Sequence, residues 1–307
     1  MQFTKYHGSG NDFILIDNRH QQWEEFIKTF IPQPVISRLL PKNNKQYSIE
    51  NKAIFELCHR NFGIGADGLM LLQNCNSADF KMIYYNSDGH LSTMCGNGGR
   101  CIAHFAAKLT IGTSVNKEKK LTFTAPDGLH YASIDEENNW VELSMNPVHE
   151  IHQSIHYPEA FVLNTGSPHF VEFIDYQEHK VATSNQNTDS FIAWAKTVRY
   201  NTEFAEAGIN VNQIYEINPG HIAIRTYERG VENETLSCGT GVTAAAIAYE
   251  YRKLKQSRTP SSSNEPIQPI TVTSLGGDLQ VRFEFSDQGF STIVLAGPAV
   301  PVFNGDL

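Results

Sequence analysis

Two stretches of this sequence place apolar residues three and four positions apart, which is the spacing of one face of an α-helix. Both stretches are rich in alanine, and each directly follows a Cys-Gly-x-Gly tetrapeptide, at residues 95–98 and 238–241. The apolar positions are Ile102, Phe105, Ala106 and Leu109 in the first stretch and Val242, Ala245, Ala246 and Tyr249 in the second. Each pattern predicts a helix with one buried face.

The rest of the pattern is typical of short strands. Runs of β-branched, aromatic and aliphatic residues, such as FILID at 13–17, LMLLQ at 69–73 and IAIRTYE at 222–228, are separated by turns of Gly, Asn, Asp and Pro. Many strands with two strongly apolar helices favour sheets that curl around a helix over alternating βαβ units. The sequence therefore predicts an α+β fold with mixed or antiparallel sheets.

Similar motifs occur in the same order in the two halves of the chain. HGSGNDF, NSDG, CGNG and TAPDG in the first half correspond to TGSPHF, YERG, CGTG and TSLGG in the second. A chain of 307 residues is also longer than most single cores. We therefore expect two pseudo-symmetric copies of one fold, over residues 1–146 and 147–295, with residues 296–307 returning to the first.

Three segments interrupt the repeated pattern. Residues 147–160 have prolines at both ends and are interpreted as the linker between the copies. Residues 21–50 and 254–268 are longer or more polar than ordinary connections. They are interpreted as surface insertions without a chemical role, the first with a short helix of its own.

Charge and cysteine usage narrow the class of protein. The formal net charge is −9 and no basic run exceeds KEKK at 117–120, so we expect no nucleic-acid partner. No window approaches an apolar membrane span and the N-terminus lacks an apolar signal region, so we expect a cytoplasmic protein without membrane contact. An odd number of cysteines without CxxC argues against a disulfide framework. Cys58, Cys75 and Cys101 are interpreted as structural residues.

Two further patterns match ligand-binding motifs without their context. GIGADG at 63–68 has glycine-rich spacing, but a helix pattern precedes it and a strand pattern follows, the reverse of a dinucleotide-binding site. His149, His152 and His156 have helical spacing, but prolines flank them and the pattern includes no carboxylate or cysteine. We therefore expect no metal site.

Cys95 and Cys238 open the two Cys-Gly-x-Gly turns. A cysteine at the start of a helix faces backbone N–H groups and the positive end of the helix dipole, which favour thiolate over thiol. A two-base racemase needs one group that removes an α-proton and a second, protonated group that supplies a proton to the opposite face. Two equivalent thiols on two copies of a fold meet that need. The N–H groups that can hold a substrate carboxylate are those of Gly96, Asn97, Gly239 and Thr240.

Other polar residues stand in the turns of the two copies. Glu228 and Arg229 form an adjacent pair that can orient a thiol or bind a charged substrate group, although such pairs are often only solvated. His169 can tune a thiol or simply complete a buried hydrogen bond. Three asparagines can bind substrate or only shape their turns. These are Asn11, Asn86 and Asn210.

With these residues in view, the chain closely resembles the diaminopimelate epimerase family nearly from end to end. The resemblance is carried, in order, by HGSGNDF, FGIGADG, YNSDG, MCGNGGRC, GSPHF, GINV, YERG and SCGTG. It implies two pseudo-symmetric domains, each with a sheet around a central helix, and an active site in the cleft between them. It also implies a homodimer without a cofactor that interconverts LL- and meso-diaminopimelate, a precursor of lysine and peptidoglycan.

The resemblance also assigns roles to individual residues. It implies catalytic roles for Cys95, Cys238, His169 and Glu228. It implies substrate-binding roles for Asn11, Asn86, Gly96, Asn97, Ser167, Asn210, Glu228, Arg229, Gly239 and Thr240. Ser167 is a departure, because the family usually has asparagine there, and a hydroxyl is shorter and has fewer donors than a carboxamide.

Two alternatives stand beside this interpretation. One is a proline or hydroxyproline racemase of the same fold, against which Arg229 and the three asparagines argue, since a substrate with one charged end would leave them unpaired. The other is an amino-acid binding protein, or a redox sensor that forms a disulfide between Cys95 and Cys238. An assay of isomerisation separates the enzyme from the second alternative.

Overall fold

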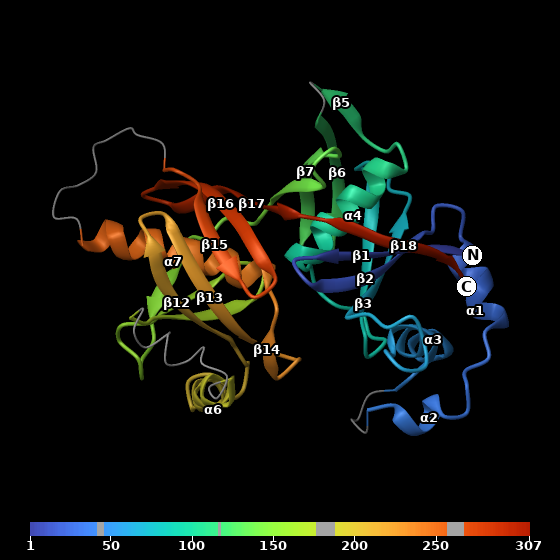
Figure 1. Cartoon of the computed structure of the whole chain (residues 1–307), viewed down its shortest axis with the longest axis horizontal. Helices are drawn as coiled ribbons and strands as arrows, with labels where there is room; N and C mark the ends of the chain where they lie inside the picture. The colour runs from blue at the N-terminus through green and yellow to red at the C-terminus, as the bar shows by residue number, and fades with distance from the viewer. Residues whose placement is uncertain (42–45, 116–117, 176–187, 257–266) are drawn as a thin grey trace. The chain divides into compact units, whose positions relative to one another are not determined.

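The computed structural model describes residues 1–41, 46–115, 118–175, 188–256 and 267–307. These residues form two compact units, which we call the N-terminal unit and the C-terminal unit (Figure 1). The N-terminal unit contains Met1–Leu143 and Pro298–Leu307, and the C-terminal unit contains Ser144–Gly297. Within the described ranges, no helix has the length and apolar character that a membrane crossing requires.

The N-terminal unit is built on a mixed sheet that the end of the chain completes, because β18 lies antiparallel to β1. Its strands are β1 (Gln2–Gly8), β2 (Asn11–Asp17), β3 (Gly68–Gln73), β4 (Phe80–Asn86), β5 (Thr113–Val115), β6 (Glu118–Ala125), β7 (Gly128–Asp135), β8 (Trp140–Ser144) and β18 (Val300–Asp306). Its helices are α1 (Gln22–Thr29), α2 (Ile36–Leu39), α3 (Ile49–Cys58) and α4 (Gly96–Lys108).

The C-terminal unit has the same kind of sheet. Its strands are β9 (Ile151–Gln153), β10 (Phe161–Asn164), β11 (Pro168–Phe173), β12 (Asn210–Asn218), β13 (His221–Glu228), β14 (Asn233–Thr235), β15 (Ile270–Ser274), β16 (Gly277–Ser286) and β17 (Gly289–Pro298). Its described helices are α6 (Thr188–Arg199) and α7 (Gly239–Gln256).

The strand pairings of one unit repeat those of the other. In the N-terminal unit, β1 to β4 pair in sequence as antiparallel, parallel and antiparallel, and β10 to β13 do the same in the C-terminal unit. The next pairing is parallel in both, β4 with β6 and β13 with β15, and each helix that follows a Cys-Gly-x-Gly lies in that crossover. The predicted duplication is therefore present in the topology.

The central helices α4 and α7 are buried more completely than the sequence pattern predicted. Every residue of 96–107 and of 239–250 is buried, so the expectation of one buried face is wrong. The reason is that strands contact each helix from several sides, β1, β2, β3, β6 and β7 for α4 and β10 to β13, β15 and β16 for α7 (Figure 1). The glycines and alanines that interrupt the apolar periodicity allow this close approach.

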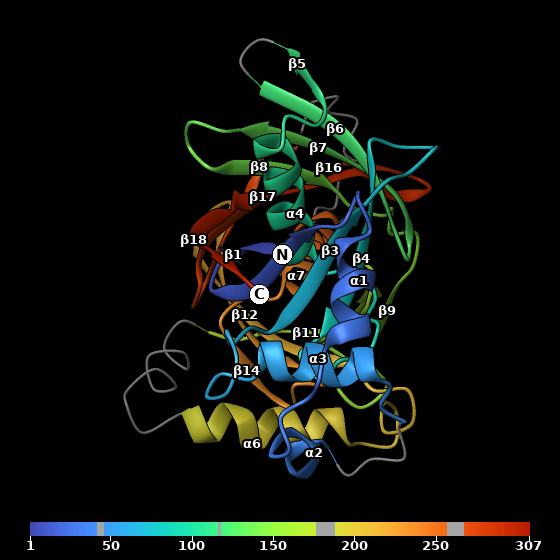
Figure 2. The same cartoon turned by 90° about the vertical axis from the view of Figure 1, so that its right-hand side faces the viewer.

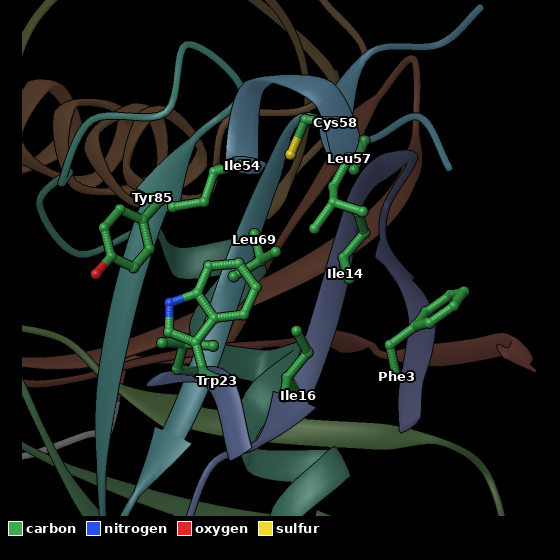
Figure 3. Packing of buried hydrophobic residues seen from close by; sticks show 11 residues of the cluster. Phe3, Ile14, Ile16, Trp23, Ile54, Leu57, Cys58, Leu69 and Tyr85 are labelled. Atoms are coloured by element: carbon green, nitrogen blue, oxygen red, sulfur yellow. The ribbon is translucent and has the colours of Figure 1, made fainter. Parts of the chain in front are cut away.

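The segment 21–50 is not only a surface insertion, as the sequence had suggested. It forms α1, α2 and the start of α3, and α1 and α2 each contact α3 (Figure 2). Trp23 is 1% exposed and packs in one cluster with Ile14, Ile16 and Ile54 (Figure 3). The segment therefore supplies part of the core, because the apolar side chains of β2 and β3 that do not face α4 need a cover.

The other two interrupting segments contribute residues to regular elements of the C-terminal unit. Residues 147–160, interpreted as a linker, contribute β9, which pairs with β10, and Val148, which pairs with Phe290. They thus belong to the sheet of the C-terminal unit. Of the expected insertion at 254–268, residues 254–256 continue α7, and 257–266 lie outside the described residues.

Candidate active site

Cys95 stands at the start of the central helix of the N-terminal unit. Its backbone is extended (φ −118°, ψ 121°), and α4 begins at the next residue, Gly96. The N–H groups of the first helical turn have no partner within the helix, so those of Gly96 and Asn97 are directed to the end of the helix that carries the thiol. The turn places a half-buried thiol beside an anion-binding helix terminus.

Asn11 is held against this thiol by a carboxylate. The thiol of Cys95 donates to Oδ1 of Asn11 over 3.6 Å, while Nδ2 of Asn11 donates to Oδ2 of Asp67 over 2.6 Å. Because Asp67 accepts from the amide nitrogen, the amide oxygen faces the sulfur. Asp67 also accepts a hydrogen bond from Arg60 over 2.7 Å, which fixes the carboxylate.

Asp12, next to Asn11, belongs to the same charged cluster. It accepts two hydrogen bonds from Arg60 and forms an ion pair with Lys5. Burial alone would raise the pKa of the Asp12 carboxyl, but the Arg60 and Lys5 cations lower that pKa to about 2. The Asp12 carboxyl is therefore ionised at neutral pH.

Asn86 lies at the same end of the sheet as Asn11. It is the last residue of β4 and pairs with Gly68, which in turn pairs with Phe13 of β2. Asn86 is exposed, and its backbone N–H donates to the carbonyl of His90 over 3.0 Å. The register thus brings this asparagine to the end of the sheet where Asn11 and Cys95 meet.

Arg100 is a functional candidate that the sequence analysis missed. It is fully buried on α4, and its guanidinium donates to Oδ1 of Asn97 over 2.9 Å and to Oγ of Ser9 over 3.3 Å. Burial lowers its pKa to about 10, so it remains a cation at neutral pH. A cation within two helical turns of Cys95 adds to the helix dipole in favouring a thiolate.

Cys238 occupies the corresponding place in the C-terminal unit, directly before α7. Its sulfur lies 3.3 Å from Oγ1 of Thr240, which lies 2.9 Å from Nε2 of His169 and 3.1 Å from Oγ of Ser167. Four predicted site residues, at the starts of β11 and α7, therefore form one hydrogen-bonded group. Gly239 begins α7 beside them and is buried.

Asn210 joins this group from β12. Its Nδ2 donates to Oγ of Ser167 over 3.1 Å and to the carbonyl of Pro168 over 2.9 Å. Its Oδ1 accepts from the backbone N–H of Arg229 over 2.9 Å. The parallel register of β11 and β12, which pairs His169 with Asn210, places these side chains together.

His169 is neutral in this setting. It is fully buried, and burial together with the nearby Arg229 cation lowers the pKa of its imidazole to about 3. A group with so low a pKa does not bind a second ring proton at neutral pH. Its contribution is that of a neutral hydrogen-bond donor and acceptor.

Glu228 and Arg229 lie at the end of β13. Glu228 is half-buried and is the last residue of the strand, while Arg229 is exposed. The Arg229 guanidinium donates to the carbonyl of Ala207 over 3.0 Å, and its backbone binds Asn210. The pair thus adjoins the group around Cys238, with the cation at the surface.

The predicted residues form two separate sets, which we call half-sites. The N-terminal half-site contains Asn11, Asp67, Asn86, Cys95, Gly96, Asn97 and Arg100. The C-terminal half-site contains Ser167, His169, Asn210, Asn212, Thr226, Glu228, Arg229, Cys238, Gly239 and Thr240. Asp67, Arg100, Asn212 and Thr226 were not singled out from the sequence. For Asn212 and Thr226, the available signal was polarity within strands that carry several apolar side chains. Asp67 precedes a strand, and Arg100 lies off the predicted apolar face of its helix.

The other cysteines differ from these two. Cys58 and Cys101 are buried in the core, and burial raises the pKa of both thiols, that of Cys58 to about 12. Cys75 is half-buried, and hydrogen bonds with Ser77 and Thr124 lower its pKa to about 7. Cys75 is therefore expected to react with alkylating reagents. A thiol assay must distinguish its reaction from those of Cys95 and Cys238.

Comparison with known proteins decides the family. The family described as diaminopimelate epimerase matches residues 3–151 and 161–302. A diaminopimelate epimerase of Flavobacterium psychrophilum is 46% identical over 303 residues, which cover 99% of this chain and 98% of the relative. The chain belongs to the diaminopimelate epimerase family. A family relative from Aquifex aeolicus is 32% identical and covers 100% of this chain and 98% of its own length.

Solved structures confirm the fold predicted for the family. A probable proline racemase from Agrobacterium radiobacter superimposes with a TM-score of 0.67 at 16% identity, covering 100% of this chain and 92% of that protein. A phenazine biosynthesis protein from Bacillus anthracis gives 0.63 at 12% identity, with coverage of 100% and 98%. At such identities the likeness concerns the fold. Together with the family membership, these findings make the chain an isomerase with two repeated α+β domains.

Proposed function

We propose that this chain interconverts LL- and meso-diaminopimelate without a cofactor, with Cys95 and Cys238 as its two acid–base groups. One observation carries the proposal: in each copy of a duplicated fold, a cysteine directly precedes the buried central helix. The names of the relatives supply the substrate, since those that match nearly the whole chain are described as diaminopimelate epimerases. The paired cysteines supply the chemistry.

In the proposed step, the thiolate of one cysteine removes the α-proton from one face of the substrate carbon. The electron pair of the broken C–H bond delocalises into the adjacent carboxylate. The thiol of the other cysteine then gives its proton to the opposite face, which inverts the configuration. The two cysteines exchange protonation states, so the next turnover in the reverse direction begins with the other base. The mechanism requires that both half-sites reach one α-carbon.

The helix termini stabilise the charge that develops on the reacting carboxylate. Backbone N–H groups at Gly96, Asn97, Gly239 and Thr240 are suited to this, because they need no reorganisation as charge accumulates. The distal end of the substrate carries an ammonium and a second carboxylate. We assign its recognition to Asn11, Asn86, Asn210, Glu228 and Arg229, whose amide and charged groups complement both. Ser167 acts through the hydrogen bond that it accepts from Asn210.

His169 has a supporting role in this proposal. The imidazole is neutral and does not exchange a proton with the substrate at working pH. Its Nε2 lies instead 2.9 Å from Oγ1 of Thr240, and that hydroxyl lies 3.3 Å from the sulfur of Cys238. Its action therefore passes through Thr240 to the sulfur.

The decisive experiment is incubation of the reduced full-length protein with LL-diaminopimelate in deuterated water. We expect meso-diaminopimelate with one solvent deuteron at the inverted α-carbon, read by mass spectrometry and chiral chromatography. L-proline and trans-4-hydroxy-L-proline serve as control substrates, because they distinguish a diaminopimelate epimerase from a proline or hydroxyproline racemase. Folded, reduced protein that exchanges the α-proton of a control substrate but not that of diaminopimelate would overturn the assignment.

Two further features remain part of the proposal. We infer a homodimer in the cytoplasm, because the family resemblance implies the first, and thiols that act as acid and base must stay reduced, which needs a reducing compartment. Light scattering after size exclusion tests the first, with about twice the chain mass of 34.4 kDa expected. Fractionation of cells that produce the chain tests the second.

A further inference from the structure

Asn212 is a buried polar residue of the C-terminal unit to which the proposed mechanism gives no role. It lies on β12 two residues after Asn210, so both side chains project from the same face of the strand. Its side chain is fully buried. A buried carboxamide is costly unless its donors and acceptor are all paired, so its partners indicate why it is there.

The orientation of this amide is set from two sides. The hydroxyl of Thr226, directly opposite on β13, donates to Oδ1 of Asn212 over 2.9 Å. On the other side, Nδ2 of Asn212 donates to the carbonyl of Phe170 over 2.8 Å. Because a backbone carbonyl only accepts, the amide nitrogen must face Phe170 and the oxygen must face Thr226.

This orientation determines the tautomer of His169. The second hydrogen of Nδ2 points to Nδ1 of His169 over 3.1 Å, so Nδ1 must accept. The neutral ring therefore carries its hydrogen on Nε2, which lies 2.9 Å from Oγ1 of Thr240 and 3.0 Å from Oγ of Ser167. The Thr240 oxygen accepts from this N–H and keeps its own hydrogen for another partner.

The hydrogen of the Thr240 hydroxyl has the sulfur of Cys238 within 3.3 Å. The Ser167 oxygen is the alternative acceptor at 3.1 Å and also accepts from Asn210, but the sulfur of a thiolate is charged and is the stronger acceptor. A hydroxyl that donates to sulfur stabilises the thiolate over the thiol. The donors thus run in one direction, from Thr226 through Asn212, His169 and Thr240 to Cys238.

Packing shows that the first turn of α7 is shaped around this chain of donors. A Cβ atom at Gly241 would lie 2.9 Å from Oδ1 of Asn212 and 3.3 Å from Cε1 of His169. The second glycine of Cys-Gly-Thr-Gly therefore leaves room for the amide and the imidazole. Any side chain there would push the network away from the helix.

We propose that Asn212 is a positioning residue for Cys238: by holding His169 as the Nε2–H tautomer, it directs the Thr240 hydroxyl at the sulfur and stabilises the thiolate. This inference rests on the proposed function, in which that thiolate is one of the two bases. Charged groups at the same end of the unit, Glu228 and Arg229, are unchanged in every variant named below.

Peptide-resolved alkylation of the reduced full-length protein tests the role of Asn212. Iodoacetamide rates at Cys238, Cys95 and Cys75 are followed from pH 5 to pH 10 by mass spectrometry of the separate peptides. We expect Asn212→Leu to raise the pKa of Cys238 by about one unit, a roughly tenfold slower alkylation at pH 7. Thr240→Val removes the donor itself, so its effect is expected to be at least as large. Cys95 and Cys75 should keep their wild-type profiles.

A matched variant controls for the loss of a buried polar group. Thr243 is fully buried one turn further along α7, and its hydroxyl donates to the carbonyl of Gly239 over 3.0 Å. Thr243→Val makes the same change as Thr240→Val but away from the sulfur. We expect it to leave the pKa of Cys238 unchanged. The positioning role would be overturned if Asn212→Leu left the pKa of Cys238 unchanged, or if it shifted the pKa of Cys95 together with that of Cys238.

A second measurement needs no substitution. The nitrogen chemical shifts of His169 in the wild-type protein distinguish its two neutral tautomers, and we expect hydrogen on Nε2. Hydrogen on Nδ1 would refute the inference even if the variants fail to fold. Because neither measurement uses substrate, a negative deuterium assay would refute the proposed function and leave this result standing. With an active enzyme, the kcat of Asn212→Leu should fall at pH 7 and recover at higher pH.

Discussion

The two half-sites use the same backbone with different chemistry around it. In the N-terminal half-site, Asn11 beside Cys95 is anchored by the carboxylate of Asp67, and Arg100 is a buried cation on the same helix. In the C-terminal half-site, the thiol of Cys238 adjoins a hydroxyl and a neutral imidazole. The hydrogen bonds at Cys95 thus lead to a carboxylate, and those at Cys238 lead to a neutral imidazole.

The difference shows which parts of a duplicated site had to stay alike. Each unit repeats the strand pairings, the crossover helix and the cysteine that precedes it, and these features supply the helix dipole and the backbone N–H groups. The supporting side chains were less constrained, because a hydroxyl donor and a nearby cation can both stabilise a thiolate. Symmetric chemistry therefore does not need symmetric surroundings.

Removal of either thiol should have the largest effect and should not distinguish the half-sites. Because a two-base inversion needs both groups, we expect Cys95→Ser and Cys238→Ser each to lower kcat by about 10³-fold. Chiral chromatography of diaminopimelate measures the loss. Cys75→Ser is the matched control and should keep its rate. Near-normal turnover in either of the first two variants would contradict the two-base mechanism.

Acid should destabilise both units through one buried histidine in each. His104 on α4 and His169 are fully buried, and burial, together with Lys108 and Arg229 respectively, lowers their pKa values to about 4 and about 3. Below the unfolded pKa of about 6.5, the unfolded chain binds protons that the folded chain refuses, so the free energy of unfolding falls as pH falls. Between pH 7 and pH 5 we expect a loss of about 2 kcal/mol per histidine.

Hydrogen exchange of peptides from each unit, in urea at pH 7 and pH 5, measures this loss separately for the two units. His104→Gln should flatten the pH dependence of the N-terminal unit, and His169→Gln that of the C-terminal unit. The chosen window lies above the titration of Asp12, whose pKa is about 2. A pH dependence that neither variant changes would mean that these histidines are not the cause.

Loss of the carboxylate in the N-terminal half-site should have a smaller effect than loss of a thiol. In Asp67→Asn, Asn11 loses its charged acceptor and its amide can turn, which takes Oδ1 away from Cys95. We expect a roughly tenfold fall in kcat/KM, as for a lost hydrogen bond to a charged group. Asp79→Asn, which removes a carboxylate bonded to Thr122, is the control. Unchanged kcat/KM in Asp67→Asn would show that the carboxylate does not position Asn11.

The two halves of the chain were equally predictable only where the information is local. Cysteine, glycine and apolar helix lie within a few residues of each other, so the thiols at 95 and 238 could be placed at helix starts from the sequence. The contact of Asn11 with Asp67 spans 56 residues and that of Asn212 with His169 spans 43. Both depend on which strands pair in parallel, which no local pattern reveals.

The extent to which individual side chains are buried could also not be predicted from the sequence pattern. Alanines and glycines are neutral in a hydrophobic repeat, so α4 and α7 were expected to have an exposed face that the structure does not have. Trp23 lies in a polar segment and yet is in the core. The neutral state of His169 follows from burial as well, since its solution pKa would leave it partly charged near pH 6.5.

The smallest expected effect lies in the C-terminal half-site and sharpens its contrast with Asp67→Asn. In Ser167→Ala, Asn210 loses one acceptor, but its Nδ2 still donates to the carbonyl of Pro168 and its Oδ1 still accepts from Arg229. His169 likewise retains Thr240. We therefore expect kcat/KM to fall only two- to threefold, about 0.5 kcal/mol, the low end for a neutral hydrogen bond. Steady-state kinetics of Ser167→Ala, Ser167→Asn and the wild type measure it. A tenfold or larger loss in Ser167→Ala, offset in Ser167→Asn, would mean that this position contacts the substrate directly rather than through the network.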